Sequence, residues 1–207
     1  EICTRRCGFC AVGKGTPNAL DPDEPQNTAI AIESLGVRHA VITSVNRDEL
    51  PDGGAAHFAA TVESVAARSP DTRIELLIPD LLGQRAPLER ILNSGPHIVA
   101  HNTETIARLY RRVRPQAIYT RSLDVIRVIA EHPQVISKTG VMLGLGETDA
   151  EVVELMHDLR EVGCEILTLG QYLSPTTRHL PVERWVHPES FEMLREMGYQ
   201  LGFTHVE

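Results

Sequence analysis

The chain has 207 residues, a length typical of one large domain. Its apolar fraction of 42% and charged fraction of 23% are ordinary for a globular protein, and 15 Gly with 13 Pro exclude a collagen-like chain. The formal net charge of −8 argues against a broad nucleic-acid or anionic-membrane surface. No apolar run reaches the ~20 residues of a membrane span, and no signal-peptide pattern is present. We therefore expect a soluble, core-forming protein.

Short apolar runs alternate with helical patterns along the chain. Strands are predicted over residues 40–45, 73–78, 98–101, 135–143 and 165–169. Helices are predicted over residues 55–67, 87–92, 103–112, 123–130, 149–162 and 188–197, with Thr103 and Thr148 as N-caps. The alternation indicates parallel β/α units. We expect an α/β fold, a partial barrel rather than a doubly wound sheet, with residues ahead of Cys3 supplying a sixth strand.

Five loops rich in Gly or polar residues follow the predicted strands or the N-terminus. They cover residues 3–10, 43–54, 101–104, 144–147 and 170–175. In β/α barrels the chemistry takes place in the loops at the carboxyl ends of the strands. We therefore expect these five loops to converge on one face and to form the active site.

Three of the four cysteines, Cys3, Cys7 and Cys10, form a C-x3-C-x2-C cluster. Three packed thiols do not suit a disulfide framework, whereas thiolates are soft ligands for zinc, copper(I) or iron–sulfur clusters. A structural zinc needs a fourth ligand, and none is visible nearby in the sequence. The spacing favours a [4Fe–4S] cluster with one open iron over a zinc site. A redox-active pair formed by Cys7 and Cys10 is a third, less favoured interpretation.

The cysteine motif, with Phe9 ahead of its last member, resembles the signature of the radical S-adenosylmethionine enzymes. Five further segments are similar to the lipoyl synthases of that superfamily, in the same order: residues 42–54, 101–105, 110–115, 138–148 and 169–175. The similarity extends from about residue 3 to the end of the chain. It implies a partial (β/α)6 TIM-like barrel of the radical S-adenosylmethionine type, with residues 1–207 as one core domain.

The resemblance also implies the chemistry. Cys3, Cys7 and Cys10 would hold a [4Fe–4S] cluster whose open iron binds the amino and carboxylate groups of S-adenosylmethionine. Cleavage of that cofactor would give a 5′-deoxyadenosyl radical, which removes hydrogen atoms at C6 and C8 of a protein-bound octanoyl-lysine before two sulfurs are inserted. Because the cofactors supply the reactivity, no catalytic side chain beyond the cluster ligands is expected.

Residues of three loops are implied as contacts of the adenosyl and methionyl parts of S-adenosylmethionine. Phe9 would lie near the adenine, while Asn102 and Glu104 would reach the ribose and the methionyl group. Gly144 and Glu147 belong to a G-x-M-x-G-x-x-E run that resembles the strand beside the adenine. Each has an ordinary structural alternative, namely aromatic packing for Phe9, a helix cap and a surface carboxylate for the pair, and a strand-to-helix turn for the run.

The methionyl end of the cofactor would be bound by further residues. Thr43, Ser44 and Asp52 occupy the loop after the second strand, counted from the one expected ahead of Cys3, and this loop contributes to the subsite in the superfamily. Lys138 would meet the methionyl carboxylate. For Asp52 the structural alternative is a solvated turn, and for Lys138 an exposed lysine at a strand end.

The predicted roles of four other residues are less specific. Arg112 and Arg114 would serve either the cofactor or the acyl-carrying partner, although by themselves they read as helix-end arginines. Cys164 is expected to be a buried free thiol, and His179 to be structural.

The resemblance implies partners as well. These are octanoylated carrier proteins (lipoyl domains of 2-oxoacid dehydrogenases and the glycine cleavage H protein) and an electron donor such as ferredoxin or flavodoxin. Neither nucleic acid nor a membrane is expected as a partner. The expected location is the cytoplasm, with an organelle left open.

Lipoyl synthases carry a second, auxiliary [4Fe–4S] cluster, held by an N-terminal C-x4-C-x5-C motif and a serine of a C-terminal Arg-Ser-Ser-Tyr motif. The sequence contains neither motif. We expect truncation at both ends rather than a natural short form, and S-adenosylmethionine cleavage as the activity of this polypeptide alone.

Two competing functions remain at this stage. A biotin-synthase-like sulfur insertase acting on a free small molecule is disfavoured by residues 110–115 and 170–175, which are more similar to lipoyl synthases. A zinc-stabilised scaffold without chemistry would need a fourth ligand beside the three cysteines. Metal analysis distinguishes an iron–sulfur enzyme from the scaffold: the enzyme would hold iron with acid-labile sulfide, and the scaffold would hold zinc.

Overall fold

A computed structural model describes residues 2–207. Six parallel strands form one sheet in the order β3-β4-β5-β6-β7-β8. The strands are β3 His39–Thr43, β4 Arg73–Leu77, β5 Ile98–Ala100, β6 Ile136–Leu143, β7 Ile166–Gln171 and β8 His205–Val206. A doubly wound sheet reverses its strand order at a switch point, whereas here sequence neighbours are always spatial neighbours. The fold is therefore the expected partial barrel.

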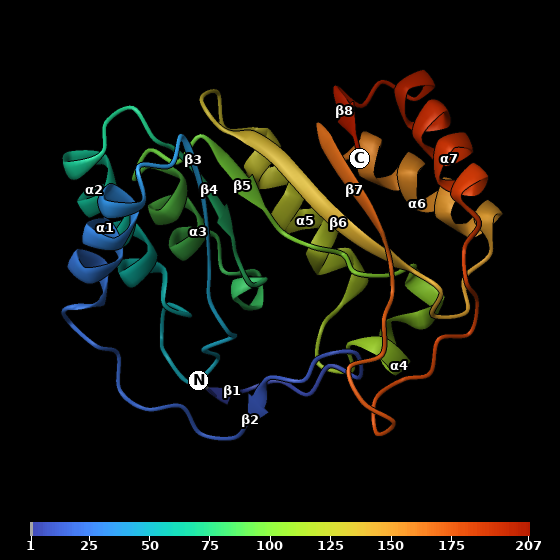
Figure 1. Ribbon diagram of the computed structural model, residues 1–207, viewed down its shortest axis with the longest axis horizontal. Helices are drawn as coiled ribbons and strands as arrows, with labels where there is room; N and C mark the ends of the chain where they lie inside the picture. Colours follow the sequence, from blue (N-terminus) through green and yellow to red (C-terminus); the bar gives the residue numbers. More distant parts are fainter. Residues whose placement is uncertain (1) are drawn as a thin grey trace.

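Helices connect the successive strands. They are α1 Glu24–Leu35, α2 Ala55–Arg68, α3 Arg85–Leu92, α4 Tyr110–Val113, α5 Tyr119–Ala130, α6 Asp149–Glu161 and α7 Pro188–Gln200, with short 3-10 turns η1 Leu81–Gly83 and η2 Ala107–Leu109. Two further short strands, β1 Ile2–Cys3 and β2 Gly13–Lys14, pair with each other. Figure 1 shows the helices ranged along the curved sheet, and β1 and β2 below it, at the end where the strands lead into their loops. Among residues 2–207, no helix is long and apolar enough to cross a membrane.

The two faces of the sheet differ in burial. Along β6, residues 137, 139, 141 and 143 are buried while the residues between them are partly exposed. The buried set includes Leu143, which shares an apolar cluster with Met156 and Leu159 of α6. The partly exposed set faces the interior of the barrel and includes Lys138, whose ammonium lies 2.9 Å from the Glu75 carboxylate. One face thus makes the core, and the other presents polar groups.

The observed elements differ from the predicted ones in three places. The sixth strand of the sheet is β8, only two residues long, and helix α1 is also absent from the sequence-based expectation. The strand expected ahead of Cys3 lies outside the described residues. The helix predicted over residues 103–112 begins later, at Ala107, because Glu104 forms a bridge to Val141 of β6 and Thr103 donates its N–H to Thr139 Oγ1. Thr103 is therefore not an N-cap.

The predicted cap at Thr148 is confirmed. Its hydroxyl accepts the N–H of Glu151 at 3.3 Å, and the Glu151 carboxylate accepts the N–H of Thr148 at 2.9 Å. This reciprocal capping box satisfies two backbone donors at the start of α6.

We expect Thr148→Ala to lower the free energy of unfolding by about 1 kcal/mol, because the first turn of α6 loses its capping acceptor. Urea denaturation followed by circular dichroism measures the change. Thr148→Ser keeps the hydroxyl and is expected to lose much less. Equal losses in the two variants would contradict the role of the hydroxyl.

Candidate functional site

The segment from Cys3 to Cys10, called the cysteine loop below, runs past the carboxyl ends of the strands (Figure 1). Its three thiols are free and partly buried. Burial raises the pKa of the Cys7 thiol, Arg114 acts in the opposite direction, and the charges of Cys10 and Cys3 raise this pKa further. All three thiols thus belong to one short loop of eight residues, whose surroundings influence the pKa of Cys7.

Backbone groups join the cysteine loop to distant parts of the chain. Thr4 N–H donates to Asn46 O at 3.3 Å, beyond β3, and Gly8 N–H donates to Val113 O at 2.8 Å, in α4. His179 Nε2 lies 3.2 Å from Cys10 O, a contact that spans 169 residues of sequence. The loop is therefore held by segments that follow three different strands, as expected from the convergence of the loops.

A buried group of charges fixes the middle of the cysteine loop. Arg5 Nε and Nη2 donate to the two carboxylate oxygens of Asp48 at 2.7 and 2.8 Å, and Nη2 also donates to Asp80 at 2.5 Å. Arg121 of α5 donates to the second oxygen of Asp80 at 3.2 Å. The Asp80 side chain is fully buried, yet hydrogen bonds and charge from Arg5 outweigh burial and lower its pKa to about 2. Two positive and two negative charges thus balance under the loop.

The turn that carries Asp80 has an unusual backbone. Leu81 and Leu82 have φ angles of +46° and +54°, in the left-handed region that residues with a side chain rarely adopt. Such conformations cost of order 1–3 kcal/mol each and persist when neighbouring contacts enforce them. Here the Asp80 carboxylate accepts the N–H of Leu82 at 3.1 Å. Sequence reasoning missed Asp80, because a Pro-Asp pair after a strand is an ordinary turn signal.

The ends of β5 and β6 bring together several of the expected residues. Glu104 has a φ of +66°, donates its N–H to Gly140 O, and accepts the N–H of Met142, both at 2.9 Å. A Cβ atom at Gly140 would lie 2.9 Å from Asn102 Oδ1, so the glycine makes room for the amide. Burial raises the pKa of Glu104, although Arg114 and a hydrogen bond from Asn102 oppose it. Asn102 and Glu104 are therefore neighbours, as the N-x-E spacing suggests.

Arg114 connects this strand edge to the cysteine loop. The residue is buried, and its Nη1 donates to Asn102 O at 2.6 Å and to Thr103 O at 3.2 Å. Its charge acts on both Cys7 and Glu104. Of the two uses considered for this residue, the geometry favours the cofactor site over the surface.

Glu147 and Gly144 shape the turn after β6. The buried Glu147 carboxylate accepts the N–H groups of Gly144 and Leu145, at 2.6 and 2.9 Å. Gly144 has a φ of +105°, and a Cβ atom there would lie 2.5 Å from both Arg184 O and Gln171 Nε2. Both residues thus determine the backbone path beside the site, and the carboxylate itself is engaged within the turn.

Two residues that were expected to contact the methionyl group bind other protein groups. Lys138 is the third residue of β6, opposite Ala100 at the carboxyl end of β5, and pairs with Glu75 at 2.9 Å and Glu207 at 3.6 Å. Asp52 accepts the N–H groups of Gly54 and Ala56 at the start of α2; these bonds lower its pKa, although burial acts in the opposite direction. Both side chains are thus engaged within the protein, and their contact with the methionyl end of the cofactor stays a prediction.

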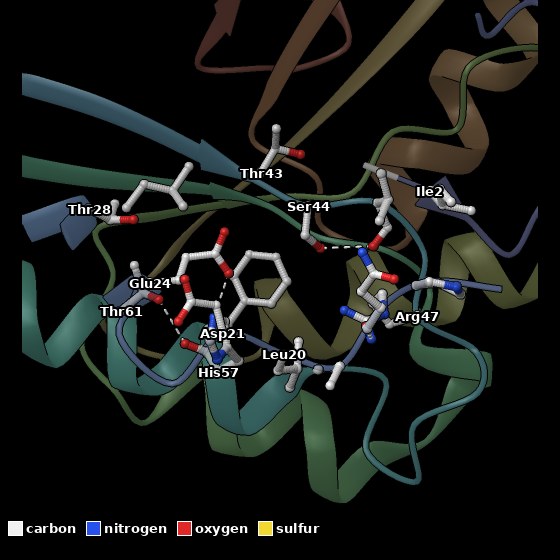
Figure 2. A pocket seen from close by; sticks show the side chains of 17 residues that line it. Ile2, Leu20, Asp21, Glu24, Thr28, Thr43, Ser44, Arg47, His57 and Thr61 are labelled. Atoms are coloured by element: carbon white, nitrogen blue, oxygen red, sulfur yellow. Dashed lines mark hydrogen bonds and ion pairs between the residues drawn. The ribbon is translucent and has the colours of Figure 1, made fainter. Parts of the chain in front are cut away.

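Thr43 and Ser44 line a cavity of about 400 Å³ beside β3. Figure 2 shows them across the cavity from His57, which pairs with Glu24 at 2.7 Å. Neither the cysteines of the loop nor Asn102 and Glu104 line this cavity. Phe9 packs against the apolar cluster under β6 and β7, which matches its structural alternative.

The donor set suits an iron–sulfur cluster and an anionic ligand group. Three buried nitrogens near the loop have no partner within residues 2–207: Arg5 Nη1, Asn46 Nδ2 and Arg114 Nε. In the same range no three Cys, His, Asp or Glu side chains surround a single metal position. A four-iron cluster instead distributes its thiolates over separate irons. Three free thiols on one loop, with unpartnered nitrogen donors on Arg5, Asn46 and Arg114, therefore fit such a cluster with a carboxylate-bearing ligand.

We expect Gly144→Ala to lower the free energy of unfolding by about 2 kcal/mol, because the new methyl group meets backbone and the positive φ is unfavourable for alanine. Gly170→Ala is the matched control in β7, since a Cβ atom there meets nothing within 4 Å. Chemical denaturation of both variants measures the difference. Indistinguishable stabilities would contradict the close approach at Gly144.

Asp80 also predicts a pH dependence of stability. A folded-state pKa of about 2, against about 3.9 in an unfolded chain, contributes about 2 kcal/mol, fully present above about pH 5 and lost as the pH falls toward 2. The difference in unfolding free energy between wild type and Asp80→Asn should therefore shrink between pH 7 and pH 3. Asp71→Asn, at an exposed position, is the control. A gap independent of pH would be inconsistent with a charged Asp80.

Comparison with known proteins identifies the family. The model of the Radical SAM superfamily matches residues 1–159. Lipoyl synthase from Caldanaerobacter subterraneus subsp. tengcongensis is 48% identical over 207 residues, covering 100% of this chain and 72% of the relative. Lipoyl synthase from Rubrobacter xylanophilus is 51% identical over 208 residues, covering 100% of this chain and 65% of the relative.

Solved structures agree on the fold. SuiB from Streptococcus suis bound to S-adenosylmethionine superposes with a TM-score of 0.72 at 12% identity, over 97% of this chain and 44% of that one. Coproporphyrinogen III oxidase (HemN) from Escherichia coli, a radical SAM enzyme, gives a TM-score of 0.67 at 12% identity, over 97% of this chain and 51% of that one. The chain thus spans about two thirds of the length of the lipoyl synthases compared. It belongs to the radical SAM superfamily and, within it, to the lipoyl synthase family.

Proposed function

We propose that residues 1–207 are the radical-generating core of a lipoyl synthase, which binds a [4Fe–4S] cluster through Cys3, Cys7 and Cys10 and cleaves S-adenosylmethionine. The observation that carries the proposal is about 50% identity to lipoyl synthases over the whole chain, with the three free thiols on one loop. When bound, the cluster supplies the electron that splits the cofactor into methionine and a 5′-deoxyadenosyl radical. The protein must hold, orient and shield these groups.

The thiols have to lose their protons to ligate iron. Burial raises the pKa of Cys7, so the free thiol is the favoured form before the metal binds. Arg114 is the nearby cation that opposes this effect and stabilises the thiolate. We therefore assign Arg114 to the support of the cluster site, and the buried position of its guanidinium favours this assignment.

Asn102 and Glu104 are proposed to contact the cofactor. Both lie where β5 meets β6, next to Arg114, which also acts on Cys7. Burial raises the pKa of Glu104, and a cationic ligand group such as the methionyl ammonium would favour its charged form again. The chemistry of the pair thus suits an amine and hydroxyl groups. Contacts of Phe9, Thr43, Ser44 and the Gly144–Glu147 turn with the cofactor stay predictions.

We infer that the longer enzyme inserts sulfur at C6 and C8 of an octanoyl-lysine on a lipoyl-carrier protein. Membership of the family supports this reaction and this class of partner. The auxiliary cluster, the choice among lipoyl domains and the glycine cleavage H protein, the ferredoxin or flavodoxin donor, and the cytoplasmic location stay predictions from the resemblance.

The test is iron and acid-labile sulfide after anaerobic reconstitution, followed by 5′-deoxyadenosine formation with dithionite and S-adenosylmethionine. We expect about four irons per chain. Cys7→Ala should lose most of the iron and all of the product while keeping the fold, because one of three ligands is gone. Cys164→Ala is the matched control, since that thiol is fully buried away from the loop.

Two results would contradict the proposal. One is normal iron content in Cys7→Ala, which would exclude the loop as the cluster site. The other is zinc in place of iron in the wild-type chain, which would favour the scaffold alternative.

A further inference from the structure

We propose that Arg5 is a positioning residue whose guanidinium, held by Asp48 and Asp80, sets the place of the cysteine loop relative to the ends of β3 and β4. The inference rests on the proposed function, because the loop matters as the holder of the cluster. It concerns neither a ligand of the iron nor a contact of the octanoyl substrate.

Arg5 stands apart from its neighbours in the loop. Only 3% of the residue is exposed, whereas the adjacent Arg6 is exposed. Its side chain enters the protein between the first two cysteines, and its N–H lies 3.4 Å from Cys3 Sγ. Any displacement of Arg5 therefore moves the backbone that carries Cys3 and Cys7.

The contacts of Arg5 are directional. One edge of its planar guanidinium binds both oxygens of Asp48, and Nη2 also reaches Asp80. Such a fork defines the orientation as well as the distance of the group, which a lysine ammonium cannot do. Three hydrogen bonds to two carboxylates thus leave the guanidinium one position.

Both carboxylates are themselves fixed. Asp48 accepts the Thr4 hydroxyl at 3.2 Å, next to the backbone bond between Thr4 and Asn46. Asp80 is bound by Arg121 of α5 and by the N–H of Leu82 in the left-handed turn. The position of Arg5 is consequently fixed by groups that follow β3 and β4 and, through Asp80, by α5.

A purely stabilising role explains this arrangement less well. Buried ion pairs add little net stability compared with apolar packing of similar volume, since desolvation opposes the attraction. A charge network placed under a metal-binding loop instead supplies geometric precision, as supporting hydrogen bonds do around other metal ligands.

Arg5→Lys tests the inference, with Arg6→Lys as the matched control, because the exposed Arg6 side chain makes no hydrogen bond or ion pair within residues 2–207. In the metal-free protein, amide hydrogen exchange of residues 4–9 should be at least about tenfold faster in Arg5→Lys and unchanged in Arg6→Lys. Thermal unfolding of the same samples verifies that the rest of the fold persists.

After anaerobic reconstitution, Arg5→Lys should hold about half of the wild-type iron or less. The remaining cluster should give an altered electron paramagnetic resonance spectrum, with a weaker response to added S-adenosylmethionine. If wild type binds iron and Arg5→Lys matches it in exchange, iron content and spectrum, the positioning role is wrong while the proposed function stands. A wild-type protein without iron overturns both.

Asp48→Asn keeps the test open should Arg5→Lys fail to unfold cooperatively. The Asp48 side chain is 24% exposed, and its replacement leaves the contact between Arg5 and Asp80. We expect faster exchange limited to residues 4–9 and a changed spectrum, both smaller than for Arg5→Lys. Wild-type behaviour of Asp48→Asn would then overturn the inference.

Discussion

Asp80 holds a negative charge where water does not reach it, and the arrangement of the site follows from neutralising that charge. A lone buried carboxylate is strongly unfavourable, so cations must approach it from within the protein. One comes from the cysteine loop and one from α5. The same carboxylate caps a turn whose two leucines lie in the left-handed region. A single buried group therefore determines both a backbone conformation and the place of the cysteine loop.

The parallel sheet makes this meeting possible. Because strands β3 to β8 are parallel, every loop that follows a strand leaves the sheet at the same edge. Residues that follow β3, β4 and β5 thereby reach one N-terminal segment. Across the same strands Glu75 of β4 pairs with His39 of β3 and with Lys138 of β6.

The predictable features are those that local chemistry encodes. Thr148 marks a helix start by its own hydroxyl, and the spacing of Cys3, Cys7 and Cys10 predicts a metal site within one short segment. The ion pair between Lys138 and Glu75 was not predicted, because it depends on the register of three neighbouring strands, which no short segment encodes. Glu104 does not start a helix, because its backbone forms a bridge to Val141 of β6. Asp80 and Arg5 became visible as partners only in three dimensions, across 75 residues of sequence.

The contact between Cys10 and His179 closes a loop over almost the entire chain. Contacts between residues so distant in sequence form late, since the entropy of closing the intervening chain has to be overcome first. The three thiols precede the segment around residue 180 in the chain, so their surroundings are completed only after that segment has been made. A cluster held by these thiols would therefore be enclosed no earlier than that point of synthesis, and until then the loop is an open peptide with free thiols.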